Sequence, residues 1–211
     1  LVICTEWTIF RTPDFEKMSN LLKNKAIFDG RNVIKKEKMN KKIEMPVATH
    51  GPRANKPYVT VRDAIYDLPF IQAGESAAAY DKMPTSAYQK LMRKNANDLL
   101  NHDAPSHPKD VIRNIKKTIP GFPMYEKFKQ RIRLHWDKPS PTQVSGGIRP
   151  QFQFGHPEMA RGETLRERCR LQSFPDDFKV MGGTVQGRVQ TGNAVPPLLA
   201  KAVAKEVIKL L

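Results

Sequence analysis

Two adjacent prolines near the C-terminal end restrict the local fold of this chain more than any other feature. Pro196 and Pro197 close the hexapeptide Gly-Asn-Ala-Val-Pro-Pro, which begins at Gly192. Proline lacks a backbone N–H, so the pair suits a helix start, where N–H groups have no intrahelical partner. The sequence therefore predicts a helix over residues 197–211. A loop of small and polar residues precedes the hexapeptide: Gly182, Gly183, Thr184 and Gly187.

The residues after the prolines have the periodicity of an amphipathic helix. Apolar residues recur at helical spacing, and three lysines, each four residues from the next, lie opposite. A Gly-Asn turn before such a helix either cradles a polar ligand or is simply a tight turn, and the local pattern favours the simple turn. The apolar positions are Leu198, Leu199, Ala202, Val203, Val207 and Leu210, and the lysines are Lys201, Lys205 and Lys209.

The charge balance indicates a polyanionic partner. The 211 residues include 36 lysines and arginines against 21 aspartates and glutamates, a formal net charge of +15. Such an excess favours nucleic acid first, a ribosome-like assembly second and an anionic membrane surface third. A solvated basic surface is the alternative.

Other classes of protein are disfavoured. No run of about 18 apolar residues would cross a membrane, and we expect no signal peptide at the start. Cys4 and Cys169 form neither a disulfide framework nor a metal-ligand cluster, so we expect no metal site. A reducing intracellular setting, cytoplasm or nucleoid, is the expectation.

Composition divides the chain into three parts. Residues 1–45 hold a short apolar segment, a predicted helix over residues 14–25, and a basic run that is either a phosphate-contacting arm or a solvated linker. Residues 46–180 are rich in turns, and residues 181–211 hold the loop, the Gly-Asn turn and the C-terminal helix.

Short helices are predicted within residues 46–180. Thr60 and Asp63 have the spacing of a capping box, and Pro69 stops the helix that the box opens. Two further helices are predicted over residues 88–100 and 110–119. The second of them should direct Val111, Ile112, Ile115 and Ile119 inward.

Strand-like alternation occurs over residues 131–136 and 151–154. A small, loop-rich β assembly with arginines on its open face would suit a nucleic-acid groove. Alternation alone, however, indicates only that one face is buried.

A second capping box begins at Thr164, with Glu167 three residues later, and the helix should run to residue 174. Arg166 and Arg170 are four residues apart, so two guanidinium groups share one side of this helix. Like charges at this spacing repel and need an anion or internal carboxylates. Glu163, Glu167, Asp176 and Asp177 are candidates for the internal role.

Two blocks of this region resemble the last two conserved blocks of DNA (cytosine-5) methyltransferases, in the same order and at the right spacing. The first covers residues 156–178, with His-Pro, Thr-Leu-Arg-Glu and Leu-Gln-Ser-Phe-Pro-Asp-Asp-Phe, and the second is Gln-Thr-Gly-Asn-Ala-Val-Pro-Pro over residues 190–197. Upstream, Arg133-Leu134 and Trp-Asp-Lys-Pro-Ser-Pro-Thr over residues 136–142 resemble the segment that closes the family's target-recognition region. The resemblance covers residues 46–211 and is strongest from 133 to 205.

The resemblance implies an α+β chain. Residues 46–180 would be a loop-rich target-recognition domain with short strands, and the C-terminal helix would belong to an α/β S-adenosylmethionine-dependent methyltransferase domain. Duplex DNA would lie between the two, with the target cytosine flipped out. The role would be DNA methylation, as in a restriction–modification system.

Site residues follow from the matching positions. The turn of Gly192, Asn193, Ala194 and Val195 would form part of the S-adenosylmethionine pocket, and Arg166, Glu167 and Arg170 would be structural. Arginine and glutamine bond to base edges, and lysine to phosphates. The candidate DNA contacts are therefore Arg131, Arg133, Gln143, Ser145, Arg149, Gln151 and Lys138, with the lysines of residues 23–42.

The family's chemical centre has no counterpart in this sequence. A Pro-Cys nucleophile, a Glu-Asn-Val glutamate and a glycine-rich cofactor loop after an N-terminal strand are absent, so no catalytic residue is assigned. We expect an inactive isolated chain that binds S-adenosylmethionine weakly or not at all. It would need a catalytic subunit or a missing N-terminal half. The alternatives are a non-catalytic, sequence-specific DNA-binding or regulatory protein and a degenerate fragment.

Overall fold

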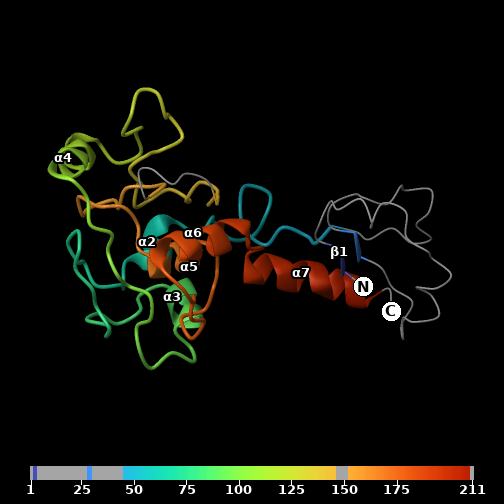
Figure 1. The fold of residues 1–211 in the computed structure, drawn as a ribbon. Coiled ribbons are helices and arrows are strands. Elements are labelled where there is room, and N and C mark those ends of the chain that lie inside the picture. The colour runs from blue at the N-terminus through green and yellow to red at the C-terminus, as the bar shows by residue number, and fades with distance from the viewer. Residues whose placement is uncertain (1, 4–27, 30–44, 146–151, 210–211) are drawn as a thin grey trace. The chain divides into compact units, whose positions relative to one another are not determined.

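The computed structural model of the protein describes residues 2–3, 28–29, 45–145 and 152–209 (Figure 1). The chain falls into two units. One contains residues 1–47 and 198–211, and the other, here called the central unit, runs from Ala48 to Pro197. None of the helices in the described ranges is long and apolar enough to cross a membrane. Within the same ranges, no group of three potential ligands is placed to hold a metal ion.

The first unit contains a short parallel pair of strands and the last helix. Strand β1 (Val2–Ile3) pairs with β2 (Phe28–Asp29), with Val2 opposite Phe28. Helix α7 (Pro197–Ile208) begins at the second proline, as the sequence predicts, and none of its residues is buried. The helix predicted over residues 14–25 and the basic run lie outside the described residues.

The central unit is built from short helices joined by long loops (Figure 1). Helix α2 packs against both α3 and α5, and α5 packs against α6. The main apolar core gathers residues of α2 with Leu68, Leu99, Leu134 and Phe154. The helices are α2 (Val61–Ile65), α3 (Ala87–Met92), α4 (Lys109–Lys117), α5 (Leu165–Leu171) and α6 (Thr184–Asn193).

Capping boxes begin three of these helices. Those at Thr60 and Thr164 are confirmed, with both reciprocal hydrogen bonds present. A third, which the sequence analysis overlooked, joins Ser86 to Gln89 at the start of α3. The Ser-x-x-Gln spacing was its signal. Helix α3 is much shorter than the helix predicted over residues 88–100.

Helix α5 ends at Leu171, before the predicted end at residue 174. Ser173 takes a left-handed conformation, with φ at 62°. The N–H of Ser173 bonds to the carbonyl of Arg170 at 3.1 Å, and the N–H of Phe174 bonds to that of Cys169 at 2.9 Å. This pair of bonds closes a helix in the Schellman manner, so the chain has already turned when it reaches the following proline.

The predicted strands over residues 131–136 and 151–154 do not form in the described part of the central unit. Isolated bridges link Pro123 with Ile132 and Arg133 with Gly155, and Gly155 also bridges to Gly162. Gly155 is in close contact with its neighbours, because a Cβ there would lie 2.9 Å from Met124 Sδ. Leu134, Phe152 and Phe154 are buried, as the alternation predicts, but Arg133 is buried beside Leu134 and breaks the pattern, and only single residue pairs form bridges.

Helix α6 is a second departure, because the sequence predicts a loop where it lies. Gly187 lowered the helix propensity of this segment. In the structure it lets α6 approach α5, since a Cβ at Gly187 would lie 2.5 Å from Leu165 Cδ1 and 3.1 Å from Val180 Cγ1. Helix α6 therefore joins the central unit, whereas the sequence placed a boundary at residue 180.

Replacing Gly187 by alanine should destabilise the central unit by about 1–3 kcal/mol, because the new methyl group overpacks the contact between α5 and α6. Urea unfolding of the full chain measures this change. Gln186→Ala, at an exposed position of the same helix, is the matched control and should alter stability by less than about 0.5 kcal/mol. Equal stability of the two variants would contradict the close packing.

Candidate functional site

Helix α5 carries three arginines into the protein interior. Arg166, Arg168 and Arg170 are each at most 1% exposed, as is Arg161 in the preceding loop. A buried charge is costly unless it is paired and hydrogen-bonded. Each of the four guanidinium groups meets this requirement differently, and their partners come from segments distant in the sequence.

Arg161 pairs with the N-terminal turn of α5. Its two terminal nitrogens donate to the two carboxylate oxygens of Glu167 at 2.9 and 2.7 Å. Glu167 also accepts from the backbone N–H of Thr164 at 2.8 Å, and the Thr164 hydroxyl lies 3.0 Å from His102 Nδ1. Burial alone would raise the pKa of Glu167, but the Arg161 guanidinium holds it well below its usual range. Glu167 is therefore a buried anion with a fixed position.

Arg170 ties α5 to α2. It forms a two-pronged contact with Asp176, with Nη2 at 2.6 Å from Oδ2, and it reaches Asp67 Oδ1 at 3.1 Å. It also donates to the carbonyl of Ala64 at 2.9 Å, and the Tyr80 hydroxyl donates to Asp176 at 2.6 Å. Two carboxylates thus surround this guanidinium.

Arg166 instead bonds to backbone carbonyls. It donates to Leu100 at 2.8 Å, to Pro175 at 3.1 Å and to Phe178 at 2.7 Å. These bonds fasten the chain before and after α5, so the contacts of Arg166 are those of a structural residue. Cys169, on the same helix, is fully buried, and burial raises the pKa of its thiol to about 11. A thiol in this state is a poor nucleophile.

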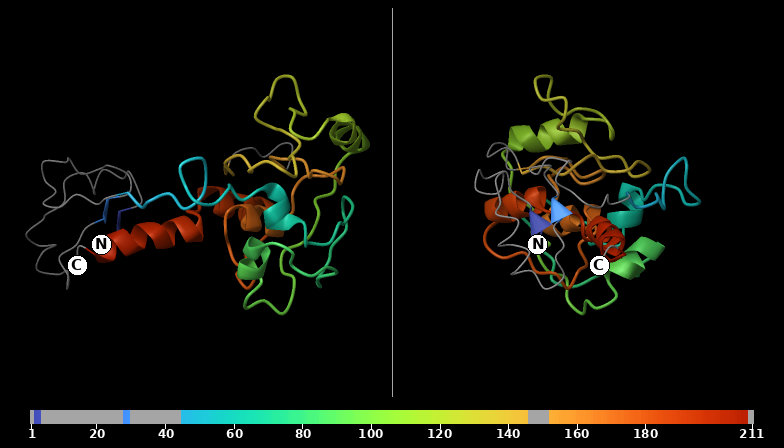
Figure 2. Two further views of the ribbon diagram at one scale, coloured as in Figure 1. Left: turned by 180° about the vertical axis from the view of Figure 1, so that it is seen from behind. Right: turned by 90° about the vertical axis from the view of Figure 1, so that its right-hand side faces the viewer.

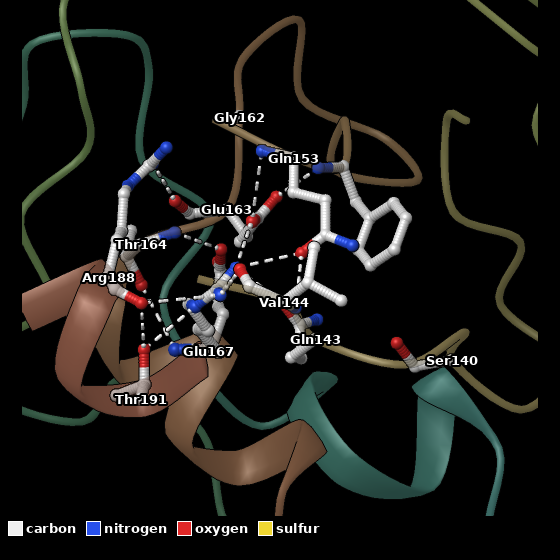
Figure 3. Close-up of polar contacts among 12 residues, drawn as sticks. Ser140, Gln143, Val144, Gln153, Gly162, Glu163, Thr164, Glu167, Arg188 and Thr191 are labelled. Carbon is white, nitrogen blue, oxygen red and sulfur yellow. Dashed lines mark hydrogen bonds and ion pairs between the residues drawn. The ribbon is translucent and has the colours of Figure 1, made fainter. Parts of the chain in front are cut away.

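Arg168 joins the segment after Thr142 to helix α6. Its guanidinium donates to Gln143 Oε1 at 2.6 Å, to the carbonyl of Val144 at 2.5 Å and to the hydroxyl of Thr191 at 2.8 Å. It also lies 3.3 Å from Glu163 Oε1. Figure 3 shows the polar contacts that gather here among Gln143, Val144, Glu163 and Thr191.

Gly192 brings the same two segments into direct backbone contact. A Cβ at this position would lie 2.2 Å from the backbone nitrogen of Ser145 and 2.4 Å from the carbonyl carbon of Val144. Every other amino acid would force the segments apart. Gly192 and Asn193, which the sequence predicts as a turn before a helix, are instead the last two residues of α6. This helix end, still called the Gly-Asn turn together with Ala194 and Val195, is fixed against residues 144–145, immediately before the undescribed residues 146–151.

The rest of the turn is more open. Asn193 is the last residue of α6, and Ala194 follows with an extended backbone, φ −76° and ψ 147°. Asn193 and Val195 are exposed, whereas Ala194 packs against the Leu165 cluster. The turn thus presents one amide and one apolar side chain, with its glycine side closed by Ser145.

The candidate DNA contacts are found in three kinds of place. Arg133 is buried, where it donates to the carbonyls of Thr118 at 3.0 Å and Glu158 at 2.9 Å, and Gln143 is buried against Arg168. Their placement favours a structural role over base reading. Lys138 is exposed, while Arg131 and Ser145 are half-buried. Arg149, Gln151 and the lysines of residues 23–42 lie outside the described residues.

Arg168 and Thr191 contribute to this site, but their sequence pattern gives no sign of that role. A helix buried on every side gives no amphipathic signal, and Leu165–Arg170 are all buried. Thr191 lay in a segment taken for a loop. The one available signal was the number of arginines in α5, which exceeds what carboxylates within the same helix can pair.

The comparisons with known proteins agree on one family. The sequence profile described as C-5 cytosine-specific DNA methylase matches residues 10–209. A type II methyltransferase of Haemophilus parahaemolyticus, M1.HphI, is 33% identical over 199 residues, covering 90% of this chain and 44% of that protein. A putative type II methyltransferase of Oceanobacillus iheyensis, M.OihORF3336P, is 47% identical over 152 residues, covering 71% and 31%.

A solved structure gives the same indication. A putative DNA modification methyltransferase encoded within a prophage of E. coli superposes with a TM-score of 0.59 at 25% identity. The match covers 74% of this chain and 48% of that one. The chain therefore spans less than half the length of each of these three relatives.

The buried histidine at position 156 should make stability depend on pH. Burial lowers the pKa of His156 to about 3, and its Nδ1 accepts the N–H groups of Glu158 and Met159 at 3.1 and 2.9 Å. Below the ordinary pKa of about 6.5 the unfolded chain binds a proton that the folded chain excludes, so stability falls as pH falls. This group alone should cost about 2 kcal/mol between pH 7 and pH 5.

Urea unfolding of the wild-type chain and of His156→Asn at the two pH values measures that contribution. Asparagine keeps an acceptor but does not titrate. The variant should be less stable at pH 7 yet lose about 2 kcal/mol less than the wild type on going to pH 5. An identical pH dependence in both proteins would contradict a neutral, buried His156.

Proposed function

The chain belongs to the C-5 cytosine-specific DNA methylase family, and we propose that it is the DNA-recognising, C-terminal portion of such an enzyme. In this proposal the central unit binds duplex DNA, and the Gly-Asn turn completes the cofactor site of a catalytic half. That half flips a cytosine and methylates its carbon 5. The chain itself contributes no nucleophile, and the buried, protonated state of Cys169 supports that assignment.

One observation carries the proposal. Gly192 lies against the backbone of Val144 and Ser145, and Arg168 donates to the carbonyl of Val144. These contacts join the turn that resembles the family's cofactor-binding segment to the segment that precedes the candidate base-reading residues Arg149 and Gln151. A methyltransferase must hold the methyl donor and the flipped base in a fixed relation, because misplacement by about 1 Å can cost 100-fold in rate. A rigid backbone contact between the two segments serves that requirement.

The residues of the turn fit one wall of an S-adenosylmethionine site. Asn193 offers an exposed amide and Val195 an exposed apolar surface, while Ser145 closes the glycine side. The cofactor supplies the methyl group. The chain would bind and orient it from one side, and the remaining walls would come from the catalytic half. We therefore expect weak or no binding by the isolated chain.

The exposure of helix α7 supports the proposal that this chain works together with a catalytic half. None of its residues is buried, and Leu199 is 51% exposed. Leu198 and Leu199 are exposed, whereas Ala202, Val203 and Val207 are half-buried, so part of the apolar face is open to a further partner. We propose that it packs on the sheet of the catalytic domain.

A non-catalytic DNA-binding or regulatory protein is the second candidate. The network of α5 is satisfied by partners within the central unit, and the net charge of +15 favours nucleic acid. Such a protein would bind duplex DNA without a catalytic half and would gain no activity from one.

Grafting this chain onto a catalytic half tests the first proposal. The matching segment of the Oceanobacillus relative is replaced by this chain, and transfer of labelled methyl groups from S-adenosylmethionine to DNA is measured. The hybrid should methylate cytosine at carbon 5, and Gly192→Ala should reduce the rate at least about 100-fold. Met83→Ala, at an exposed position, is the control and should leave the rate unchanged.

An inactive hybrid that nevertheless binds DNA would favour the regulatory alternative. Full activity of the Gly192→Ala hybrid would show that the turn does not form part of the cofactor site. Calorimetry on the isolated chain adds an independent check, because tight binding of S-adenosylmethionine there would contradict a shared site.

DNA binding by the full chain should weaken steeply with salt. Each lysine that neutralises a phosphate contributes about −0.9 to the slope of log K against log salt. Lys138→Ala should therefore reduce the slope by about 1, measured by fluorescence anisotropy with a mixed-sequence duplex. Lys90→Ala, an exposed lysine on α3, is the matched control, and an equal change in both variants would contradict a specific contact.

A further inference from the structure

Helix α4 and residues 119–131 form one rigid element of the central unit. The side-chain amide of Asn114 donates to the carbonyl of Met124, and Ile115 packs with Met124 and Phe152. Backbone bonds hold the hairpin to the next segment, among them the N–H of Gly121 to the carbonyl of Arg133 at 2.7 Å. The right-hand view of Figure 2 shows the yellow-green helix beside this hairpin. We call the pair the α4 platform.

The α4 platform exposes three large apolar side chains. Ile119 is 68% exposed, Phe122 60% and Phe128 47%. The sequence predicted that Ile119 would point inward, but helix α4 ends at Lys117 and Ile119 lies beyond it. Turn hydrogen bonds hold the segment that carries them, among them Phe122 N–H to the carbonyl of Ile119 at 3.1 Å and Phe128 N–H to that of Tyr125 at 3.3 Å. Single exposed apolar residues need no explanation, but three such side chains on one short segment are candidates for a contact surface.

Exposed lysines are the sequence neighbours of these apolar side chains, with Glu126 as the one exposed acid of the segment from Lys116 to Arg131. Lys116 and Lys117 precede Ile119, and Lys127 and Lys129 flank Phe128; all four lysines are exposed. The surface is also continuous with Lys138, because a Cβ on Gly121 would lie 3.9 Å from Lys138 Nζ. Lysine is depleted from protein–protein interfaces, so a lysine rim around aromatic side chains favours nucleic acid over a protein partner.

We propose that the α4 platform is a second contact surface for duplex DNA, next to the phosphate contact of Lys138. The lysines bind phosphates, and Phe122 and Ile119 contact sugars and base edges in the adjoining groove. This inference rests on the proposed DNA-binding function and adds to it a surface on which, of the candidate DNA contacts, Arg131 alone lies. The two kinds of contact have different signatures, since only the lysines release counterions when DNA binds.

The lysine contribution is tested by anisotropy titrations of the full chain with a fluorescein-labelled, mixed-sequence 30-base-pair duplex at several salt concentrations. The double variant Lys116→Ala with Lys117→Ala should reduce the slope of log K against log salt by about 2. The matched control is Lys90→Ala with Lys94→Ala, two exposed lysines at α3, and it should leave the slope unchanged.

The apolar contribution is tested in the same titrations. Phe122→Ala should weaken binding about 10-fold, because burial of a phenylalanine side chain in the groove is lost, with an unchanged salt slope, and Phe122→Leu should lose less. Met83→Ala, which truncates a side chain that is 80% exposed, should bind like the wild type. Thermal unfolding of every variant shows whether a loss of binding reflects a loss of fold. If Phe122→Ala is unstable, the salt slope of the double lysine variant alone tests whether the α4 platform contacts DNA.

The outcomes separate the two proposals. A wild-type chain that does not bind the duplex overturns the proposed function and this inference together. Wild-type binding that neither the lysine pair nor Phe122→Ala changes overturns the α4 platform alone. Phe122-dependent binding to phosphatidylserine vesicles, with DNA binding unaffected, would assign the surface to a membrane and overturn it equally.

Discussion

The central unit depends on the pairing of buried guanidinium groups with carboxylates. Arg161 and Arg170 each bind a carboxylate six residues away through two hydrogen bonds, and Arg170 also reaches Asp67, 103 residues away in the sequence. Removing one partner from such a pair typically costs about 3–5 kcal/mol, because the other charge stays buried and unpaired. Short helices and loops have few apolar contacts of their own. The charged pairs therefore determine which loops pack against one another. A small apolar core alone would specify that arrangement less well.

That dependence explains why a loop-rich unit can hold a functional turn in a fixed place. Arg168 belongs to the same helix as Arg170, and it contacts Val144 in the loop before residue 146 and Thr191 in helix α6. The rigidity of α5 is thus extended outward to the two segments that meet at Gly192. The turn and the segment before residue 146 share one support, and a change in either is expected to move the other.

The features that were predicted correctly from the sequence are those that depend on residues close together in the chain. The capping boxes at Thr60 and Thr164 and the start of α7 at Pro197 formed because each depends on residues within one turn of helix. Helix α6 and the missing strands depend on contacts between segments, such as Gly187 against Leu165, which no spacing rule contains. The prediction of Arg133 as a DNA contact also lacked the contacts between distant segments. Alternation showed a polar residue in a strand-like segment, but its carbonyl partners come from other loops.

The contrast between α5 and α7 indicates where the chain is complete in itself. Every residue from Leu165 to Arg170 is buried with its charges paired, whereas α7 buries none of its residues. Full burial of a leucine or valine side chain contributes about 1.5–3 kcal/mol, and the exposed Leu198 and Leu199 of α7 do not gain this stabilisation within the chain. The two helices therefore differ in what stabilises them: α5 is held by paired charges inside the central unit, whereas α7 leaves Leu198 and Leu199 available for a further contact.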